Sequence, residues 1–203
     1  MVINVSIIGA GGHTRSLINL LELNNYNING IYDDSFDELN EEIINNYKVI
    51  GRIVDIKQTQ NIIISVGDCR QKYLLYNTFS NQVLKKNLLH PFSIIEKRVC
   101  IGQSNQIFSN VYINANSIIG NNNIINTGSI IEHETKIEDH NHISVGSILC
   151  GRVSVGSQCF IGAGAVIIDK INICDNVVIG ANSVVINNIT QSGSYAGNPA
   201  VKI

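Results

Sequence analysis

The sequence predicts an α/β domain with a Rossmann-like half fold, followed by a left-handed parallel β-helix built from hexapeptide repeats. Three observations predict this order. An aliphatic residue recurs at every sixth position from Ile95 to Val185, a glycine-rich turn follows an apolar run near the N-terminus, and the six-residue period is absent from the first 90 residues. We therefore assign residues 1–90 to the α/β domain and residues 91–203 to the β-helix.

The six-residue period continues through 91 residues without an insertion. A hexapeptide is long enough for one short strand and one turn, and three of them close a triangular coil of about 18 residues. Successive coils stack at roughly 4.8 Å, the spacing of paired strands. The repeat thus predicts about five coils, with the aliphatic side chains inside the prism. An ordinary β-sandwich with accidental six-residue spacing is the alternative.

The positions around the aliphatic residues also repeat. The residue two places earlier is usually small or β-branched, which leaves room inside the prism, and Gly often follows directly. We expect Asn and Gly at the corners, because these residues tolerate positive φ. The small or β-branched residues are Ser93, Val99, Val111, Ser117, Ser129, Thr135, Ser147, Val153, Cys159, Ala165 and Ser183, and the glycines are Gly102, Gly120, Gly156, Gly162 and Gly180.

The N-terminal domain begins with the pattern of a βαβ unit. Residues 2–8 form a short apolar run, residues 9–13 a glycine turn, and residues 14–22 an amphipathic helix. Strand, glycine turn and helix in this order are typical of the start of a Rossmann-like sheet. Two more strands, at residues 28–32 and 62–66, and a helix at residues 70–79 complete the predicted domain.

Glycine or acidic residues follow each of these predicted strands. Because the carboxyl ends of parallel strands meet at one sheet edge, we expect Gly11, Asp33 and Gly67 to line one crevice. Glycines let the backbone approach a phosphate, and a helix N-terminus stabilises its charge. The Gly-x-Gly-x-x-Gly fingerprint is incomplete, since Thr14 stands at its last position, so a merely tight turn is the alternative. For Asp33–Asp34 the alternative is a solvated loop.

Composition excludes several classes of function. The net charge of −2 gives no basic excess for binding nucleic acid or an anionic membrane. No apolar run approaches the ~18 residues of a membrane helix, and the first residues lack the pattern of a signal peptide. The five Cys residues contain no Cys-x-x-Cys pair, so we expect neither a disulfide framework nor a zinc site. We therefore expect a cytoplasmic protein.

The sharpest change in polarity within the repeat lies at Glu132-His133-Glu134 and Asp139-His140-Asn141-His142. A neutral imidazole is the natural general base near neutral pH, and an adjacent carboxylate can orient it and raise its basicity. His133 and His142 are nine residues apart, half a coil, so they cannot stack within one chain. A cleft shared with a neighbouring copy could use one of them. A metal site and plain surface histidines are the alternatives.

The motifs together resemble one family. The Gly-x-Gly-Gly-His turn, the Asp-Asp after the second strand, the Ile-Glu-His-Glu and the His-Ile-Ser-Val-Gly are similar to those of sugar acetyltransferases. That family includes sialic acid O-acetyltransferases and the N-acetyltransferases of nucleotide-linked 4-amino sugars, and the bacillosamine-pathway type is the most similar in pattern. The segment Tyr195-Ala196-Gly197-Asn198-Pro199-Ala200 resembles the ending of hexapeptide acyltransferases in general.

The resemblance implies a homotrimer with active sites between adjacent β-helices. It implies that His133 is the general base and Glu134 the carboxylate that raises its basicity. It further implies that Gly151 supplies a backbone N–H to the oxyanion. Asp68 stands where the family has a polar amide. The implied acetyl-CoA contacts also include His142, Ala163 and Ala181, and the implied nucleotide-sugar pocket consists of Gly11, Gly12, His13, Asp33, Asp34 and Gly67.

The expected reaction is direct transfer of acetyl from acetyl-CoA to the amine of a UDP- or dTDP-linked 4-amino sugar, for glycan biosynthesis. His133 would take the proton of the amine, and a backbone donor would stabilise the oxyanion. The Cys residues need no role, and no metal is expected. An O-acetyltransferase of sialic or related nonulosonic acids and a non-catalytic β-helix binding module are the alternatives.

Overall fold

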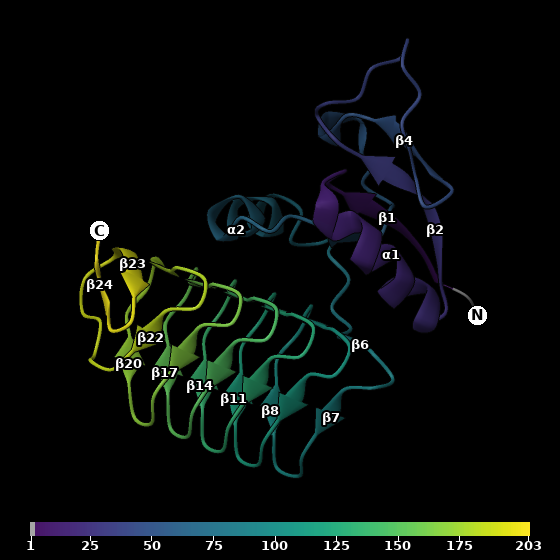
Figure 1. The fold of residues 1–203 in the computed structure, drawn as a ribbon. Helices are drawn as coiled ribbons and strands as arrows, with labels where there is room; N and C mark the ends of the chain where they lie inside the picture. The colour runs from purple at the N-terminus through teal and green to yellow at the C-terminus, as the bar shows by residue number, and fades with distance from the viewer. Residues whose placement is uncertain (1–2) are drawn as a thin grey trace.

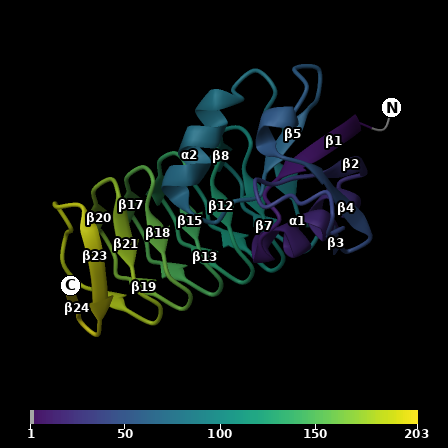
Figure 2. The ribbon, with the colours of Figure 1, turned by 90° about the horizontal axis from the view of Figure 1, so that it is seen from above.

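The protein is described here by a computed structural model that covers residues 3–203. A small α/β domain sits at one end of a long triangular prism, and helix α2 lies along the prism (Figure 1, Figure 2). The N-terminal elements are β1 (Ile3–Ile8), α1 (Gly12–Leu23), β2 (Tyr26–Tyr32), β3 (Ile43–Ile44), β4 (Tyr47–Gly51), the 3₁₀ turn η1 (Ile53–Asp55), β5 (Ile62–Ile64) and α2 (Cys69–Thr78).

The N-terminal sheet has the order β3-β4-β2-β1-β5, and its strands are parallel except for the β3–β4 hairpin. The predicted strands and helices are confirmed, while residue 2 lies outside the described part. The sequence analysis missed β3 and β4. Their two-residue turn, Asn45-Asn46, has positive φ at both positions, which is the type of turn that Asn pairs favour. That signal was present in the sequence.

The C-terminal part is a left-handed parallel β-helix, as predicted. Its strands form three sheets, and the strands from Leu88 to Ile167 each pair with the strand 18 residues further along the chain, as in Tyr112↔Ile130. The first sheet, which we call sheet D, contains β7 (Ile94–Ile95), β10 (Tyr112–Ile113), β13 (Ile130–Ile131), β16 (Ile148–Leu149), β19 (Val166–Ile167) and β22 (Val184–Val185). Sheet E contains β8 (Cys100–Ile101), β11 (Ile118–Ile119), β14 (Lys136–Ile137), β17 (Ser154–Val155) and β20 (Asn172–Ile173).

The third sheet, sheet C, carries the N-terminal domain. It begins with a strand that pairs with β9 before residue 91, and it ends in an antiparallel hairpin. Its strands are β6 (Leu88–Leu89), β9 (Gln106–Ile107), β12 (Ile124–Ile125), β15 (His142–Ile143), β18 (Phe160–Ile161), β21 (Val177–Ile179), β23 (Gly193–Gly197) and β24 (Ala200–Lys202).

The prism interior follows the predicted period. From Ile107 to Val185 the aliphatic residues of the repeat are at most 3% exposed, and the small residues two places earlier are buried beside them. Burying one such side chain stabilises the fold by roughly 1.5–3 kcal/mol. A polar substitution at any of these positions would leave a polar group inside the prism without water.

Positive φ recurs every six residues, from Arg98 to Asn182. The expectation of Asn or Gly holds at Asn110, Asn116, Asn122, Gly128, Gly146, Gly164, Asn176 and Asn182. The same conformation is held by Arg98, Ser104, Glu134, His140, Arg152, Gln158 and Lys170. The glycines that follow the aliphatic residues are required by close packing between coils and not by positive φ. A Cβ at Gly102 would lie 2.6 Å from the carbonyl oxygen of Gly120 in the next coil, so close stacking excludes a side chain there.

Helix α2 docks on the prism through a buried, partly polar face. Lys72 is fully buried, and its Nζ donates to the carbonyl oxygen of Asn141 at 2.8 Å, while the thiol of Cys69 donates to the carbonyl oxygen of Cys159, one coil further, at 3.2 Å. The rings of Tyr73 and Tyr76 both meet the ring of His140 edge-on, at 5.1 Å. Residues three or four positions apart lie on one face of α2. Their spacing along the helix thus matches the spacing between successive coils of the prism.

Candidate functional site

The glycine turn after β1 is open where a ligand would approach. Gly9 has φ +108°, and a Cβ there would lie 2.6 Å from the carbonyl oxygen of Ser65, so this position requires glycine. A Cβ at Gly11 or Gly12 would meet no atom within 4 Å. No side chain caps the start of α1 at Gly11. The turn therefore leaves the first helical N–H groups and an open space beside them, an arrangement that suits an anion.

The acidic pair after β2 divides into two roles. Asp33 Oδ2 accepts a hydrogen bond from the N–H of Ala10 at 2.7 Å, which ties the pair to the glycine turn. Burial raises the pKa of Asp33, but hydrogen bonds from Ser35 and Ala10 outweigh it and leave the pKa below its ordinary value. Asp34 is exposed and accepts from the N–H of Ile53 at 3.2 Å. Asp33 is thus structural as well as accessible, and Asp34 faces solvent.

The turn after β5 lies on the β-helix. The carbonyl oxygen of Gly67 is 3.1 Å from His142 Nδ1, and Asp68 caps α2 by accepting from the N–H of Gln71 at 2.7 Å. A hollow of about 430 Å³ opens beside this turn, between the start of α2 and sheet C. Its lining residues are Gly67, Asp68, Cys69, Arg70, Gln158, Phe160, Asn176 and Val178.

Two histidines meet beneath these turns. The rings of His13 and His142 are 6.0 Å apart, and His13 Nε2 is 2.8 Å from Oε1 of Gln106. Burial and the nearby Lys72 ammonium lower the pKa of His142 to about 4. Burial also lowers the pKa of Lys72 itself, to about 8. His142 is therefore neutral near pH 7, and as donor to the Gly67 carbonyl it carries its proton on Nδ1.

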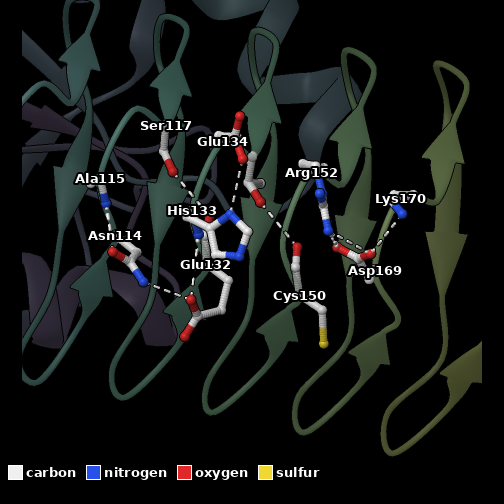
Figure 3. A network of polar contacts seen from close by, with 11 residues as sticks. Asn114, Ala115, Ser117, Glu132, His133, Glu134, Cys150, Arg152, Asp169 and Lys170 are labelled. Carbon is white, nitrogen blue, oxygen red and sulfur yellow. Dashed lines mark hydrogen bonds and ion pairs between the residues drawn. The ribbon is translucent and has the colours of Figure 1, made fainter.

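His133 lies at a different place, on the corner that joins β13 of sheet D to β14 of sheet E (Figure 3). Its Nδ1 is 3.2 Å from Oε2 of Glu134, and its side chain is 45% exposed. A carboxylate accepts hydrogen bonds, so this contact assigns the proton to Nδ1 and leaves the lone pair on Nε2. Glu134 has φ 60°, so the backbone presents this carboxylate from a left-handed corner, a position that Asn or Gly fills in about half of the repeats.

Gly151 lies against the His133 ring, one coil further along the prism. A Cβ at Gly151 would be 2.6 Å from Cε1 and 2.7 Å from Nε2 of His133, and 3.1 Å from Oδ1 of Asp169. The absence of a side chain at Gly151 therefore makes the space that the imidazole of His133 occupies. Within residues 3–203 the N–H of Gly151 donates to no acceptor, so it remains free to bind an oxyanion.

An ion-pair group borders this corner. Arg152 donates through its Nη2 to both oxygens of Asp169, at 3.1 and 3.0 Å, and Lys170 Nζ is 3.7 Å from Asp169 Oδ2 (Figure 3). These side chains are 43–67% exposed, so solvent screens the pair and its contribution to stability is small. These contacts hold the Asp169 carboxylate beside Gly151, where its Oδ1 would lie 3.1 Å from a Cβ at that glycine.

The structure brings some predicted residues together and keeps others apart. The glycine turn, Asp33, His13, Gly67 and His142 form one group between the α/β domain and sheet C. His133, Glu134 and Gly151 form a second group at the corner between sheets D and E. Ala163 and Ala181 are exposed at the opposite edge of sheet D, at corners where the chain passes from sheet C to sheet D. The role of each residue toward a substrate remains a prediction.

Sequence reasoning missed Gln106 and Lys72. Both are buried between the domains, and both form their contacts across long stretches of chain. Within residues 3–203, no group of three His, Cys, Asp or Glu side chains is placed to hold a metal ion. In the same range, neither helix has the length and apolar character that crossing a bilayer requires.

Comparisons with known proteins agree with this geometry. Residues 4–79 match the family model of the PglD N-terminal domain. The predicted resemblance to sugar acetyltransferases is confirmed. A histidine variant of perosamine N-acetyltransferase from Caulobacter crescentus, in complex with CoA and GDP-perosamine, is 27% identical, covers 100% of this chain and 98% of its own, and has a TM-score of 0.92.

Two further structures share the whole fold. The acetyltransferase domain of PglB from Neisseria gonorrhoeae FA1090, in complex with acetyl coenzyme A, is 25% identical over 100% of both chains, with a TM-score of 0.90. WeeI from Acinetobacter baumannii AYE is 20% identical over 100% of both chains, with a TM-score of 0.85, and supports the fold alone. No curated protein sequence matches. The two structures that are 27% and 25% identical support the enzyme class, an acyltransferase, that the resemblance implied.

Proposed function

We propose that the protein is an N-acetyltransferase that transfers acetyl from acetyl-CoA to the amine of a nucleotide-linked 4-amino sugar, for glycan biosynthesis. The observation that carries the proposal is the His133 corner. There an imidazole with a free Nε2 lies against a glycine whose N–H has no acceptor within residues 3–203. The structural relatives bound to CoA with GDP-perosamine, or to acetyl coenzyme A, support the class of both substrates.

The proposed reaction follows from these atoms. The neutral sugar amine attacks the thioester carbonyl carbon, and its proton passes to Nε2 of His133 as the N–C bond forms. The N–H of Gly151 binds the oxygen that becomes negative. The C–S bond then breaks, and the proton on His133 passes to the sulfur of CoA. Glu134 holds the ring in the tautomer that this proton transfer needs.

Recognition of the nucleotide sugar is proposed for the crevice of the α/β domain. The open N–H groups at Gly11 and Gly12 suit the diphosphate, and Asp33 and Asp34 suit hydroxyl or base N–H donors. The family resemblance implies UDP or dTDP, whereas the relative from Caulobacter crescentus is in complex with GDP-perosamine. The experiment that tests the proposal must therefore compare substrates with different nucleotides.

The test is a panel assay of CoA release from acetyl-CoA. The acceptors are 4-amino sugars linked to UDP, dTDP and GDP, together with free sialic acid as a hydroxyl acceptor. Turnover of a nucleotide amino sugar supports the proposal. Turnover of sialic acid alone would assign the protein to the O-acetyltransferases, and no turnover of any acceptor by the folded protein would favour a binding module.

We further propose that the working form is a homotrimer. The outward-facing residues of sheet D are all apolar or aromatic, namely Ile94, Tyr112, Ile130, Ile148, Val166 and Val184. Sheet E instead presents the mixed set Cys100, Ile118, Lys136, Ser154 and Asn172. An apolar face of this kind is suited to packing against another copy.

This packing would also complete the acetyl-CoA site. His133 and Gly151 border sheet D on one side, and Ala163 and Ala181 border it on the other. If sheet D packs against a neighbouring copy, the edge of one copy that carries Ala163 and Ala181 can border the same cleft as His133 and Gly151 of the other. We expect sedimentation equilibrium to give three times the 22.2 kDa of the single chain. A monomer at assay concentration would contradict the shared site.

We expect Asp34→Ala to raise the KM for the nucleotide sugar roughly tenfold or more and to leave the KM for acetyl-CoA within about twofold. Asp34 is exposed at the end of β2, on the domain proposed to bind the sugar, and it makes one hydrogen bond to the backbone. Steady-state kinetics with each substrate varied in turn measure both constants. Glu41→Ala, which removes an exposed carboxylate paired with Lys48, is the control. Equal rises in both constants would make Asp34 a structural residue.

A further inference from the structure

Gln106 joins the substrate crevice to the β-helix. It stands on β9, it is 3% exposed, and its side-chain amide is engaged at both ends. Nε2 donates to the carbonyl oxygen of Ile64 at 2.7 Å, and Oε1 is 2.8 Å from Nε2 of His13. Ile64 ends β5, and His13 lies in the first turn of α1. One buried amide therefore contacts both segments that border the proposed crevice.

These contacts fix the proton on His13. A backbone carbonyl oxygen accepts hydrogen bonds only, so the NH₂ group of Gln106 must face Ile64. The carbonyl oxygen of Gln106 then faces His13, and this oxygen also accepts only. The hydrogen between them therefore belongs to His13 Nε2. No side-chain or backbone group within residues 3–203 is hydrogen-bonded to Nδ1, which is left with its lone pair.

The ring is held neutral as well as oriented. Burial lowers the pKa of His13, the hydrogen bond to Gln106 opposes this, and the ammonium of Lys72 lowers it further. The ring of Phe108 packs edge-on at 5.3 Å, and the ring of His142 lies on another side. A neutral ring whose only N–H is already used cannot donate a hydrogen bond to a phosphate. It can accept one.

We propose that Gln106 is a positioning residue, which locks His13 as the Nε2–H tautomer so that Nδ1 accepts a hydrogen bond from a hydroxyl or amine of the sugar nucleotide. This inference rests on the proposed function, because it assigns a part of the same substrate. Recognition of the sugar nucleotide would then have two parts. The backbone N–H groups of the glycine turn serve anionic oxygens, and His13 serves a donor group of the substrate.

The kinetic test replaces the amide by an apolar group of similar size. Gln106→Leu releases the His13 ring into two tautomers and removes the tie to Ile64. We expect the KM for the nucleotide sugar to rise about tenfold, with kcat and the KM for acetyl-CoA within about twofold. Gln103→Leu, the same change at an exposed residue of the same coil, is the matched control and should change none of these values.

The spectroscopic test uses the wild-type protein and so does not depend on the variant folding. Long-range ¹⁵N–¹H correlation spectra of ¹⁵N-histidine-labelled protein report which ring nitrogen carries the proton, and loss of one signal set in His13→Asn assigns His13. We expect His13 to carry its proton on Nε2 in the free protein. A proton on Nδ1, or on both nitrogens, at neutral pH would overturn the inference whatever the kinetics give.

The two tests separate this inference from the proposed function. If no nucleotide amino sugar is acetylated by wild type, the proposed function fails, and so does the assignment of His13 to a sugar nucleotide. If wild type transfers acetyl but folded Gln106→Leu keeps its KM for the nucleotide sugar, the inference alone fails. Gln106→Glu keeps the acceptor for His13 Nε2 and should retain the Nε2–H signal, which distinguishes the His13 contact from the Ile64 contact.

Discussion

We expect replacement of His133 by alanine to lower kcat by about 10²–10⁴ and to leave the affinity for acetyl-CoA nearly intact. The reason is that Nε2 of His133 is the atom proposed to accept the proton of the attacking amine. The acetyl-CoA contacts that the family resemblance implies at Ala163 and Ala181 do not involve this atom, so binding of acetyl-CoA is expected to persist. The side chain is 45% exposed and lies outside the prism, so the loss of folding stability is small.

Single-turnover rates and acetyl-CoA titrations of the variant measure these two quantities separately. Glu134→Ala should lose less activity, because it removes the orienting carboxylate and keeps the base. His90→Ala, a histidine in the loop between β6 and β7, is the control and should turn over normally. A folded His133→Ala protein with near-normal turnover would eliminate the proposed mechanism.

The β-helix could be predicted because its constraint is local and repeated. Each hexapeptide must place one aliphatic residue inside the prism, so a polar residue at any sixth position would have broken the visible pattern. The corners follow a weaker rule. Glu134 and His140 adopt positive φ although neither is Asn or Gly, and left-handed backbone is unfavourable for such residues by roughly 1–2 kcal/mol. Both belong to the acidic and histidine-rich stretch that the sequence singled out.

The docking of the two domains could not be read from the sequence. Helix α2 was predicted, but its buried face includes Lys72, which any hydrophobicity pattern assigns to solvent. The partner of Lys72 is a backbone carbonyl 69 residues away, and that of His13 is a side chain 93 residues away. Such contacts depend on how the α/β domain sits on sheet C. A six-residue period contains no information about this.

The candidate site likewise contains contacts that could be predicted from the sequence and contacts that could not. His133 and Glu134 are neighbours in sequence, so their pairing could be anticipated from the residues themselves. The role of His142 was inferred from resemblance, and in this chain its ring is 7% exposed beneath the Gly67 turn. Its proposed contact with acetyl-CoA therefore requires the cofactor to reach the edge of that turn. The contact stays a prediction.

Gly151→Ala is expected to reduce kcat by about 10²-fold or more while the protein remains folded. The added Cβ would lie 2.6 Å from Cε1 and 2.7 Å from Nε2 of His133, so the imidazole must move away. The movement is easy for the fold, because the ring is half-exposed and flexible. It is costly for the reaction, because the ring leaves the position from which Nε2 reaches the amine, and the methyl group fills the space beside the Gly151 N–H.

The measurement compares kcat with the midpoint of thermal unfolding for two glycine variants. Gly128 has φ +69°, and a Cβ there would meet no atom within 4 Å, so Gly128→Ala strains the backbone by about 1–2 kcal/mol without touching the His133 corner. We expect Gly128→Ala to unfold at lower temperature and to turn over normally, and Gly151→Ala to show the reverse. Normal turnover by Gly151→Ala would mean that the base acts from another position, because the ring position in this structure is incompatible with the added methyl group.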